Sequence, residues 1–177
     1  QVHAATNHAG EPLAVKVQYP GVAAGIRADL ALLRGVLRPT RLGHVFAACF
    51  EELEDRLAEE LDYQCEAAHT EWFREHLRLP GIIVPRVERA LSTRRVLTTT
   101  RLGGVHLDQW LATQPSQVAR DHYGQLLVDL FYHSVFALGR LHADPNLGNY
   151  LFLPGGELGL LDFGCVRSLP SSFAEGL

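Results

Sequence analysis

The chain has 177 residues, of which 47% are hydrophobic and 20% charged, and its formal net charge is −4. This composition is typical of a globular protein long enough to bury a core. The negative charge disfavours broad binding to nucleic acid, which requires a basic surface.

The amino-terminal part of the chain predicts two strands followed by a helix. Short apolar runs at Val2–Ala5 and Leu13–Gln18 flank the turn-forming stretch NHAGEP. Apolar residues then recur at helical spacing as far as Pro39, which ends the helix: Val22, Ile26, Leu30, Leu33 and Leu37.

A longer helix is predicted next, where apolar residues from Leu53 to Trp72 advance by three or four positions and form one stripe. The β-branched runs 81–85 and 94–102 predict strands, and Gly103 and Gly104 interrupt the second run. We expect this break to be a hinge between two lobes, residues 1–102 and 103–177.

The carboxy-terminal part predicts helices, a polar loop and a hairpin. A short helix is expected at Leu107–Leu111 and a long apolar helix from about Val118 to Leu141. After the loop HADPNLGN, the runs Tyr150–Leu153 and Leu158–Leu161 predict a hairpin around the turn PGG.

Thiol content and hydropathy bear on the setting of the protein. Three Cys without a C-x-x-C pair indicate reduced thiols in an intracellular protein, and no Cys/His cluster suggests zinc. We find no signal peptide and no apolar run that could span a bilayer. The expected location is cytoplasmic, with peripheral membrane association through other parts of a longer protein, because the chain lacks Met and begins within a strand-like run.

The polar residues of the loop and hairpin suggest chemistry. Asp144 and Asn149 lie five residues apart, and Asp162 follows at the far end of the hairpin. A carboxylate and an amide oxygen suit Mg²⁺, which keeps waters and bridges substrate phosphates. The remaining carboxylate can orient or deprotonate a nucleophile, as phosphoryl transfer requires.

The spacing of these residues matches kinase signatures. H-x-D-x-x-x-x-N followed by D-F-G corresponds to the catalytic and metal loops, with Ala143 where Arg is usual. The strand LAVKV matches the lysine strand and places Lys16 to hold phosphates. Each motif alone could be coincidence, since a strand often carries a surface lysine. Together and in this order, they predict a nucleotide site.

Five blocks in order over nearly the whole chain, AVKVQYPGV, EELDYQCEA, VPRV with VLTTTRLGGV, LHADPNLGN and LLDFG, resemble the UbiB/AarF atypical kinase-like family. That family is tied to ubiquinone biosynthesis and to quinone or lipid homeostasis. The chain resembles the aminoglycoside/choline kinase group less closely. The UbiB/AarF resemblance implies an α+β, protein-kinase-like two-lobed fold, truncated here, and ATP or ADP with Mg²⁺ as cofactors.

The resemblance also implies roles for individual residues. Lys16 would contact the phosphates, and Asp144 would be the catalytic aspartate. Asn149 and Asp162 would hold the metal, while Glu66 would pair with the lysine.

The family's E-x-D motif falls on Glu60-Leu61-Asp62, so Glu60 and Asp62 are expected to serve the cofactor as well. Asp62 and Glu66 share a helix face, whereas Glu60 and Asp62 are about 200° apart on a regular helix. Glu60 and Glu66 should therefore have different partners if the helix is unbroken. A solvated surface position is the alternative for both glutamates. His142 is expected to be a packed, hydrogen-bonded residue that shapes the loop.

Two functions remain open. One is a Mg²⁺-dependent ATPase or kinase of small molecules or lipids. The other is a catalytically restrained module that binds a quinone precursor, a lipid or a partner protein of quinone biosynthesis, with nucleotide as a structural switch. The family's K-x-G-Q extension and alanine-rich loop are not in this sequence.

Overall fold

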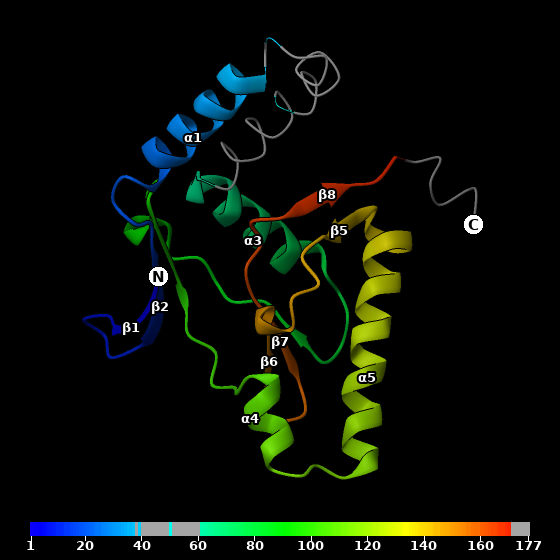
Figure 1. The fold of residues 1–177 in the computed structure, drawn as a ribbon. Helices are drawn as coiled ribbons and strands as arrows, with labels where there is room; N and C mark the ends of the chain where they lie inside the picture. Colours follow the sequence, from blue (N-terminus) through cyan, green and yellow to red (C-terminus); the bar gives the residue numbers. More distant parts are fainter. Residues whose placement is uncertain (38, 40–49, 51–60, 171–177) are drawn as a thin grey trace.

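The computed structural model describes residues 1–37, 39, 50 and 61–170 (Figure 1). Its elements in chain order are β1 (Val2–Thr6), β2 (Pro12–Val17), α1 (Val22–Leu37), α3 (Tyr63–His76), β3 (Ile82–Ile83), η1 (Arg89–Leu91), β4 (Val96–Thr100), α4 (Leu107–Ala112), α5 (Gln117–Tyr132), η2 (His133–Leu138), β5 (Arg140–His142), η3 (Leu147–Asn149), β6 (Tyr150–Phe152), β7 (Leu158–Leu160) and β8 (Val166–Ser168).

The first sheet contains β1, β2 and β4 in that order, with both pairs antiparallel. The β1–β2 turn forms because the Asn7 side chain accepts hydrogen bonds from the backbone N–H groups of Ala9 and Glu11, and Gly10 adopts a left-handed φ of 85°. In this register Lys16 lies opposite Val2 on one side and Leu97 on the other. The lysine therefore occupies the central strand.

The second sheet has the order β3-β7-β6, and β5 pairs with β8 in a third. Helix α3 packs against both larger sheets. Ala67 lies in a cluster with Leu97 of the first sheet, whereas Phe73 lies in a cluster with Leu160 of the second sheet and Phe163. The core centre is thus the region that joins α3 to the second sheet, where these aromatic side chains are fully buried.

The predicted helix from Leu53 to Trp72 is interrupted. Leu61 lies in a turn, and α3 begins at Tyr63, with Asp62 as an extended N-cap residue whose side chain accepts a hydrogen bond from the Gln64 N–H. The apolar stripe continues across this point, but the preference of Asp for N-cap positions prevails. Residues 51–60 lie outside the described part.

The predicted helix from Val118 to Leu141 ends early. Helix α5 stops at Tyr132 and continues as a π-helical segment to Leu138, and Gly139 ends it with a left-handed φ of 59°. Arg140 and Leu141, expected to be helical, form β5 together with His142, and this strand pairs with β8. The sequence analysis missed both of these short strands.

The chain crosses between the two larger sheets twice within residues 82–105. It leaves β3 in the second sheet to form β4 in the first, and then returns to a bridge between Val105 and Phe152. Gly104 is needed at the second crossing, because an added Cβ would lie 2.9 Å from the Leu151 Cβ and 3.0 Å from the Phe152 carbonyl oxygen. The hinge expected at Gly103 and Gly104 stays a prediction. Across the described residues, no helix has the length and apolarity to cross a membrane.

Candidate functional site

One face of the first sheet forms a wall of a cavity of about 310 Å³. Directly paired residues on neighbouring strands share a face. Ala14 lies opposite Thr99, and Lys16 opposite Leu97 and Val2, and all five line the cavity. The strand register thus points Lys16 into the cavity from a wall that is otherwise mostly apolar.

Helix α3 supplies the partner of Lys16. The start of α3 is held beside β4 because the Tyr63 N–H donates to the Arg94 carbonyl. This places Glu66 within one turn of the helix start, 5% exposed, with both carboxylate oxygens 2.9 Å from the Lys16 Nζ. The Lys16–Glu66 pair expected from the family resemblance is therefore present.

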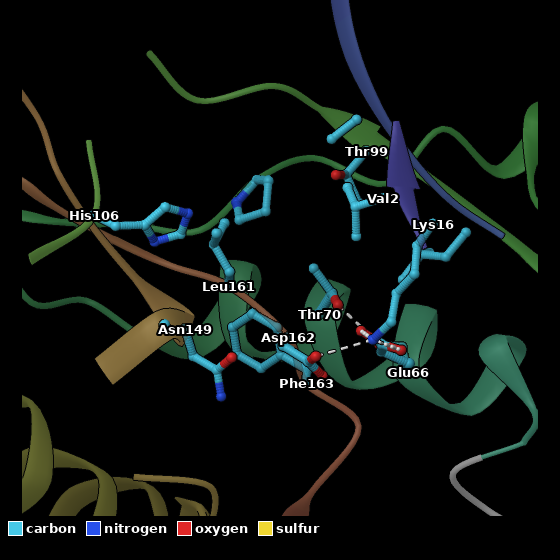
Figure 2. A pocket seen from close by; sticks show the side chains of 14 residues that line it. Val2, Lys16, Glu66, Thr70, Thr99, His106, Asn149, Leu161, Asp162 and Phe163 are labelled. Atoms are coloured by element: carbon cyan, nitrogen blue, oxygen red, sulfur yellow. Dashed lines mark hydrogen bonds and ion pairs between the residues drawn. The ribbon is translucent and has the colours of Figure 1, made fainter. Parts of the chain in front are cut away.

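Asp162 approaches the same ammonium from the second sheet. Its Oδ2 lies 3.0 Å from the Lys16 Nζ, and its Oδ1 accepts a hydrogen bond from the Gly164 N–H. Figure 2 shows Lys16 reaching down between Glu66 and Asp162. Side chains from three segments distant in the sequence thus meet at the Lys16 ammonium.

The backbone of Asp162 has a left-handed φ of 54°, which is unfavourable for a residue with a Cβ. Its neighbours hold it there. The Phe163 ring is fully buried against Phe73, and the His142 Nε2 lies 2.6 Å from the Asp162 carbonyl oxygen and 3.1 Å from that of Leu161. The expectation that His142 is a packed, loop-shaping residue is confirmed.

The loop between β5 and β6 positions Asp144 and Asn149. The Asn149 amide nitrogen donates to the Asp144 Oδ2 at 2.7 Å, and the Asn146 N–H donates to the Asp144 Oδ1 at 3.1 Å. With its nitrogen so engaged, the Asn149 amide oxygen points toward Asp162 (Figure 2). Asn149 lines the cavity, whereas Asp144 lies outside its lining and connects to it through Asn149.

Burial and charge shift the pKa values of the three central groups. Burial raises the pKa of Glu66 to about 7, against the attraction of Lys16. Burial opposes the ionised forms of Lys16 and Asp162 as well, but their mutual attraction prevails. The two carboxylates raise the pKa of Lys16, and the ammonium lowers that of Asp162.

Comparison with known families identifies this arrangement. The ABC1 atypical kinase-like domain matches residues 1–177, the whole chain. The chain belongs to the ABC1 atypical kinase-like family. The resemblance to UbiB/AarF proteins is thereby confirmed.

Relatives of this ABC1 chain include two mitochondrial atypical kinases. It is 33% identical over 180 residues to COQ8B of Danio rerio and 34% identical over 184 residues to coq-8 of Caenorhabditis elegans. Both alignments cover 99% of this chain but only 28% and 24% of those proteins. The chain thus spans about a quarter of these curated relatives.

A solved structure supports the fold. The structure of Rv3197 from Mycobacterium tuberculosis, determined with erythromycin, matches 96% of the ABC1 chain and 44% of its own, with a TM-score of 0.83 and 34% identity. The predicted α+β, kinase-like fold is confirmed.

The E-x-D motif of this ABC1 chain is only partly described. Glu60 lies outside the described residues. The Asp62 carboxylate caps α3 and accepts a hydrogen bond from the Arg94 Nε at 3.0 Å, outside the cavity lining. Because Asp62 precedes the helix, it does not share a helix face with Glu66 as expected. A cofactor contact for Asp62 stays a prediction, and the contacts observed are structural.

Sequence reasoning missed three polar residues that line the ABC1 cavity. They are Thr70, Thr99 and His106. Thr70 and His106 lie outside the motifs, and Thr99 lies within the block VLTTTRLGGV, which assigns it no role. Thr99 could have been placed only from the register of β4 against β2, and a register depends on contacts between distant segments.

The oxygen donors of the ABC1 site suit magnesium. Within the described residues, no group of three His, Cys, Asp or Glu could hold a metal. Mg²⁺ needs fewer protein ligands, because it keeps waters and binds substrate phosphates. Asp162 offers a carboxylate and Asn149 an amide oxygen directed toward it (Figure 2), so this pair fits Mg²⁺.

We expect Glu66→Gln to change how the stability of the ABC1 chain depends on pH. A pKa of about 7 in the folded protein, against an ordinary 4.5, means that folding takes up a proton between these values. The stability contributed by Glu66 is therefore complete below pH 4.5 and is lost as the pH rises to about 7. In the glutamine variant this loss should disappear, a difference in slope of up to about 1.4 kcal/mol per pH unit.

Urea unfolding of both proteins at pH 5, 6 and 7 measures this difference. All other side chains are common to both proteins, so their effects cancel in the difference between the two profiles. Glu71→Gln is the matched control, because pairing with Arg89 lowers the Glu71 pKa, so its effect should be constant over this range. Parallel profiles for wild type and Glu66→Gln would refute the protonation of Glu66.

Proposed function

We propose that this ABC1 chain binds a magnesium nucleotide, ATP or ADP, and that the full protein transfers the γ-phosphoryl group of ATP. One observation carries the proposal: Lys16 from the first sheet and Asn149 and Asp162 from the two ends of the β6–β7 hairpin line one cavity. An ammonium beside two oxygen donors is the arrangement that phosphoryl transfer uses.

Each residue would have a distinct task. Glu66 holds the Lys16 ammonium by two hydrogen bonds, so the lysine is oriented before a phosphate arrives. Asn149 and Asp162 would hold Mg²⁺, which neutralises phosphate charge when bound. Asp144 would orient or deprotonate the acceptor hydroxyl, and its bond to Asn149 fixes both side chains.

The cavity walls are consistent with a nucleotide base. Ala14 and Leu97 on the first sheet and Leu161, which follows β7, give it apolar lining. Its volume of about 310 Å³ is at the lower end of the range for small-molecule sites. An apolar wall with a charged end matches the two halves of a nucleotide.

A restrained binding module is the second candidate. It is favoured by the position of Asp144, which lies outside the cavity lining and whose two carboxylate oxygens already accept hydrogen bonds within the loop. In either case we propose a role in quinone biosynthesis, with a quinone precursor, a lipid or a protein of that process as the partner. Family membership alone supports this role.

A single side chain can report nucleotide binding, because Lys16 is the sole lysine of the sequence. We expect lysine labelled with ¹³C at Cε to give one side-chain NMR signal in the 177-residue chain, and that signal to shift on addition of Mg²⁺-ATP. ATP with EDTA should shift it less, because the metal positions the phosphates.

A signal unchanged by millimolar Mg²⁺-ATP would refute nucleotide binding by this chain. The matched control is Glu71→Gln, whose substitution lies on the same helix but outside the cavity lining. Its spectrum should respond to nucleotide as the wild type does.

A further inference from the structure

Three carboxylate oxygens surround the Lys16 ammonium. Both oxygens of Glu66 lie 2.9 Å from the Lys16 Nζ, and the Asp162 Oδ2 lies 3.0 Å from it. The Tyr63 ring adds a further contact, with its centroid 5.3 Å from Nζ. An ammonium has three N–H donors, so these three oxygens use all of them. Lys16 can therefore bind a phosphate only by giving up one of these hydrogen bonds.

The two carboxylates hold the ammonium unequally. Glu66 accepts two hydrogen bonds and 6% of its side chain is exposed, whereas Asp162 accepts one and 42% of its side chain is exposed. An ion pair is weaker where water and salt screen it. The contact between Lys16 and Asp162 is thus the one that an incoming phosphate would break.

The same contact involves the proposed metal ligand. The Asp162 Oδ2 accepts from Lys16, and its Oδ1 accepts from the Gly164 N–H at 3.2 Å. A cation that binds Asp162 while Lys16 stays in place must share the carboxylate with an ammonium, and like charges at short range repel each other. Lys16 therefore competes with a metal ion for Asp162.

We propose that the Lys16–Asp162 ion pair is an autoinhibitory contact that keeps divalent cations off Asp162 until the phosphates of a nucleotide draw Lys16 away. This inference rests on the proposed function and adds an order of binding to it. The metal enters with the nucleotide and not before it. Glu66 keeps its two hydrogen bonds to Lys16 throughout, so the ammonium has to move only away from Asp162.

Binding of Mn²⁺ without nucleotide tests the contact, because Mn²⁺ favours the same oxygen ligands as Mg²⁺ and paramagnetic resonance measures the free ion. The double variant Lys16→Gln, Glu66→Gln loses one charge of each sign. Its net charge equals that of the wild type at pH 8, above the Glu66 pKa of about 7. We expect it to bind Mn²⁺ about ten-fold more tightly, the effect of one hydrogen bond between charged groups. Equal affinities would overturn the inference.

Two further variants assign the gain in affinity to this contact. Adding Asp162→Asn to the double variant should abolish the gain, because Asp162 is the ligand that the double variant makes free. The matched control is Glu71→Gln with Arg89→Gln, which removes an ion pair between α3 and η1 outside the cavity lining. It should bind Mn²⁺ as the wild type does. A gain that survives Asp162→Asn, or that appears in the control, would also overturn the inference.

The wild-type chain provides a second measurement if the double variant does not fold. The signal of its single lysine should stay in place with millimolar Mg²⁺ alone and shift with Mg²⁺-ATP. An equal shift with Mg²⁺ alone would overturn the autoinhibitory contact and leave nucleotide binding intact. A signal that responds to neither would refute the proposed function, and the inference with it.

Discussion

Replacing Asp162 with Asn is expected to reduce Mg²⁺-dependent nucleotide affinity by at least about 100-fold, because the variant loses a charged metal ligand. It also loses the ion pair with Lys16, whose Nζ lies 3.0 Å from the Asp162 Oδ2. The fold should survive, since Asn tolerates the left-handed backbone at this position better than most residues. Calorimetric titration with Mg²⁺-ATP, together with circular dichroism, measures both outcomes.

Asp129→Asn is the matched control. Asp129 lies on α5 and accepts a hydrogen bond from the Gln125 side chain, outside the lining of the cavity. The affinity of the Asp129→Asn variant for Mg²⁺-ATP should equal that of the wild type. An unchanged affinity in Asp162→Asn would count decisively against the proposed site.

Replacing Asp144 with Asn is expected to lower ATP turnover by the full protein about 10²- to 10⁴-fold, the usual contribution of a general base. Nucleotide affinity should fall much less, because Asp144 lies outside the cavity lining. A smaller loss of Mg²⁺ affinity is expected, since the variant's amide has a single acceptor oxygen for two donors, the Asn146 N–H and the Asn149 amide nitrogen, and so fixes Asn149 less firmly. The assay is release of ADP at saturating Mg²⁺ and ATP.

The same assay distinguishes the two proposed functions. A phosphoryl-transfer enzyme should turn over ATP, and its rate should depend on Asp144. A wild-type protein that binds nucleotide but releases no ADP, with binding insensitive to Asp144→Asn, would support the restrained module. Equal turnover in the wild type and in Asp144→Asn would exclude Asp144 as the catalytic base.

The sequence was most informative where structure depends on local pattern. Strand alternation at Leu13–Gln18 and the spacing from His142 to Asn149 placed the lysine strand and the polar loop correctly. The motifs also selected Lys16, Glu66, Asn149 and Asp162, which the structure brings together at or beside one cavity. Their roles toward a nucleotide stay predictions.

The sequence was least informative where distant contacts decide the structure. Strand β3 has only two residues, and no local sequence pattern indicates its parallel pairing with β7. Apolar residues continue at helical spacing past Gly139, so only the pairing with β8 distinguishes β5 from a continued helix. The apolar spacing predicts that Asp62 lies within a continuous helix, although Asp is also a common N-cap residue and caps α3 here.

The double crossing of the chain between the larger sheets limits how the cavity can open. A single tether would allow the sheet that carries Lys16 to tilt in any direction away from the one that leads to Asp162. Two tethers, at 84–95 and 101–104, restrain that tilt, and helix α3 restrains it further because it packs against both sheets. Any widening of the entrance must therefore bend these two segments or break contacts of α3.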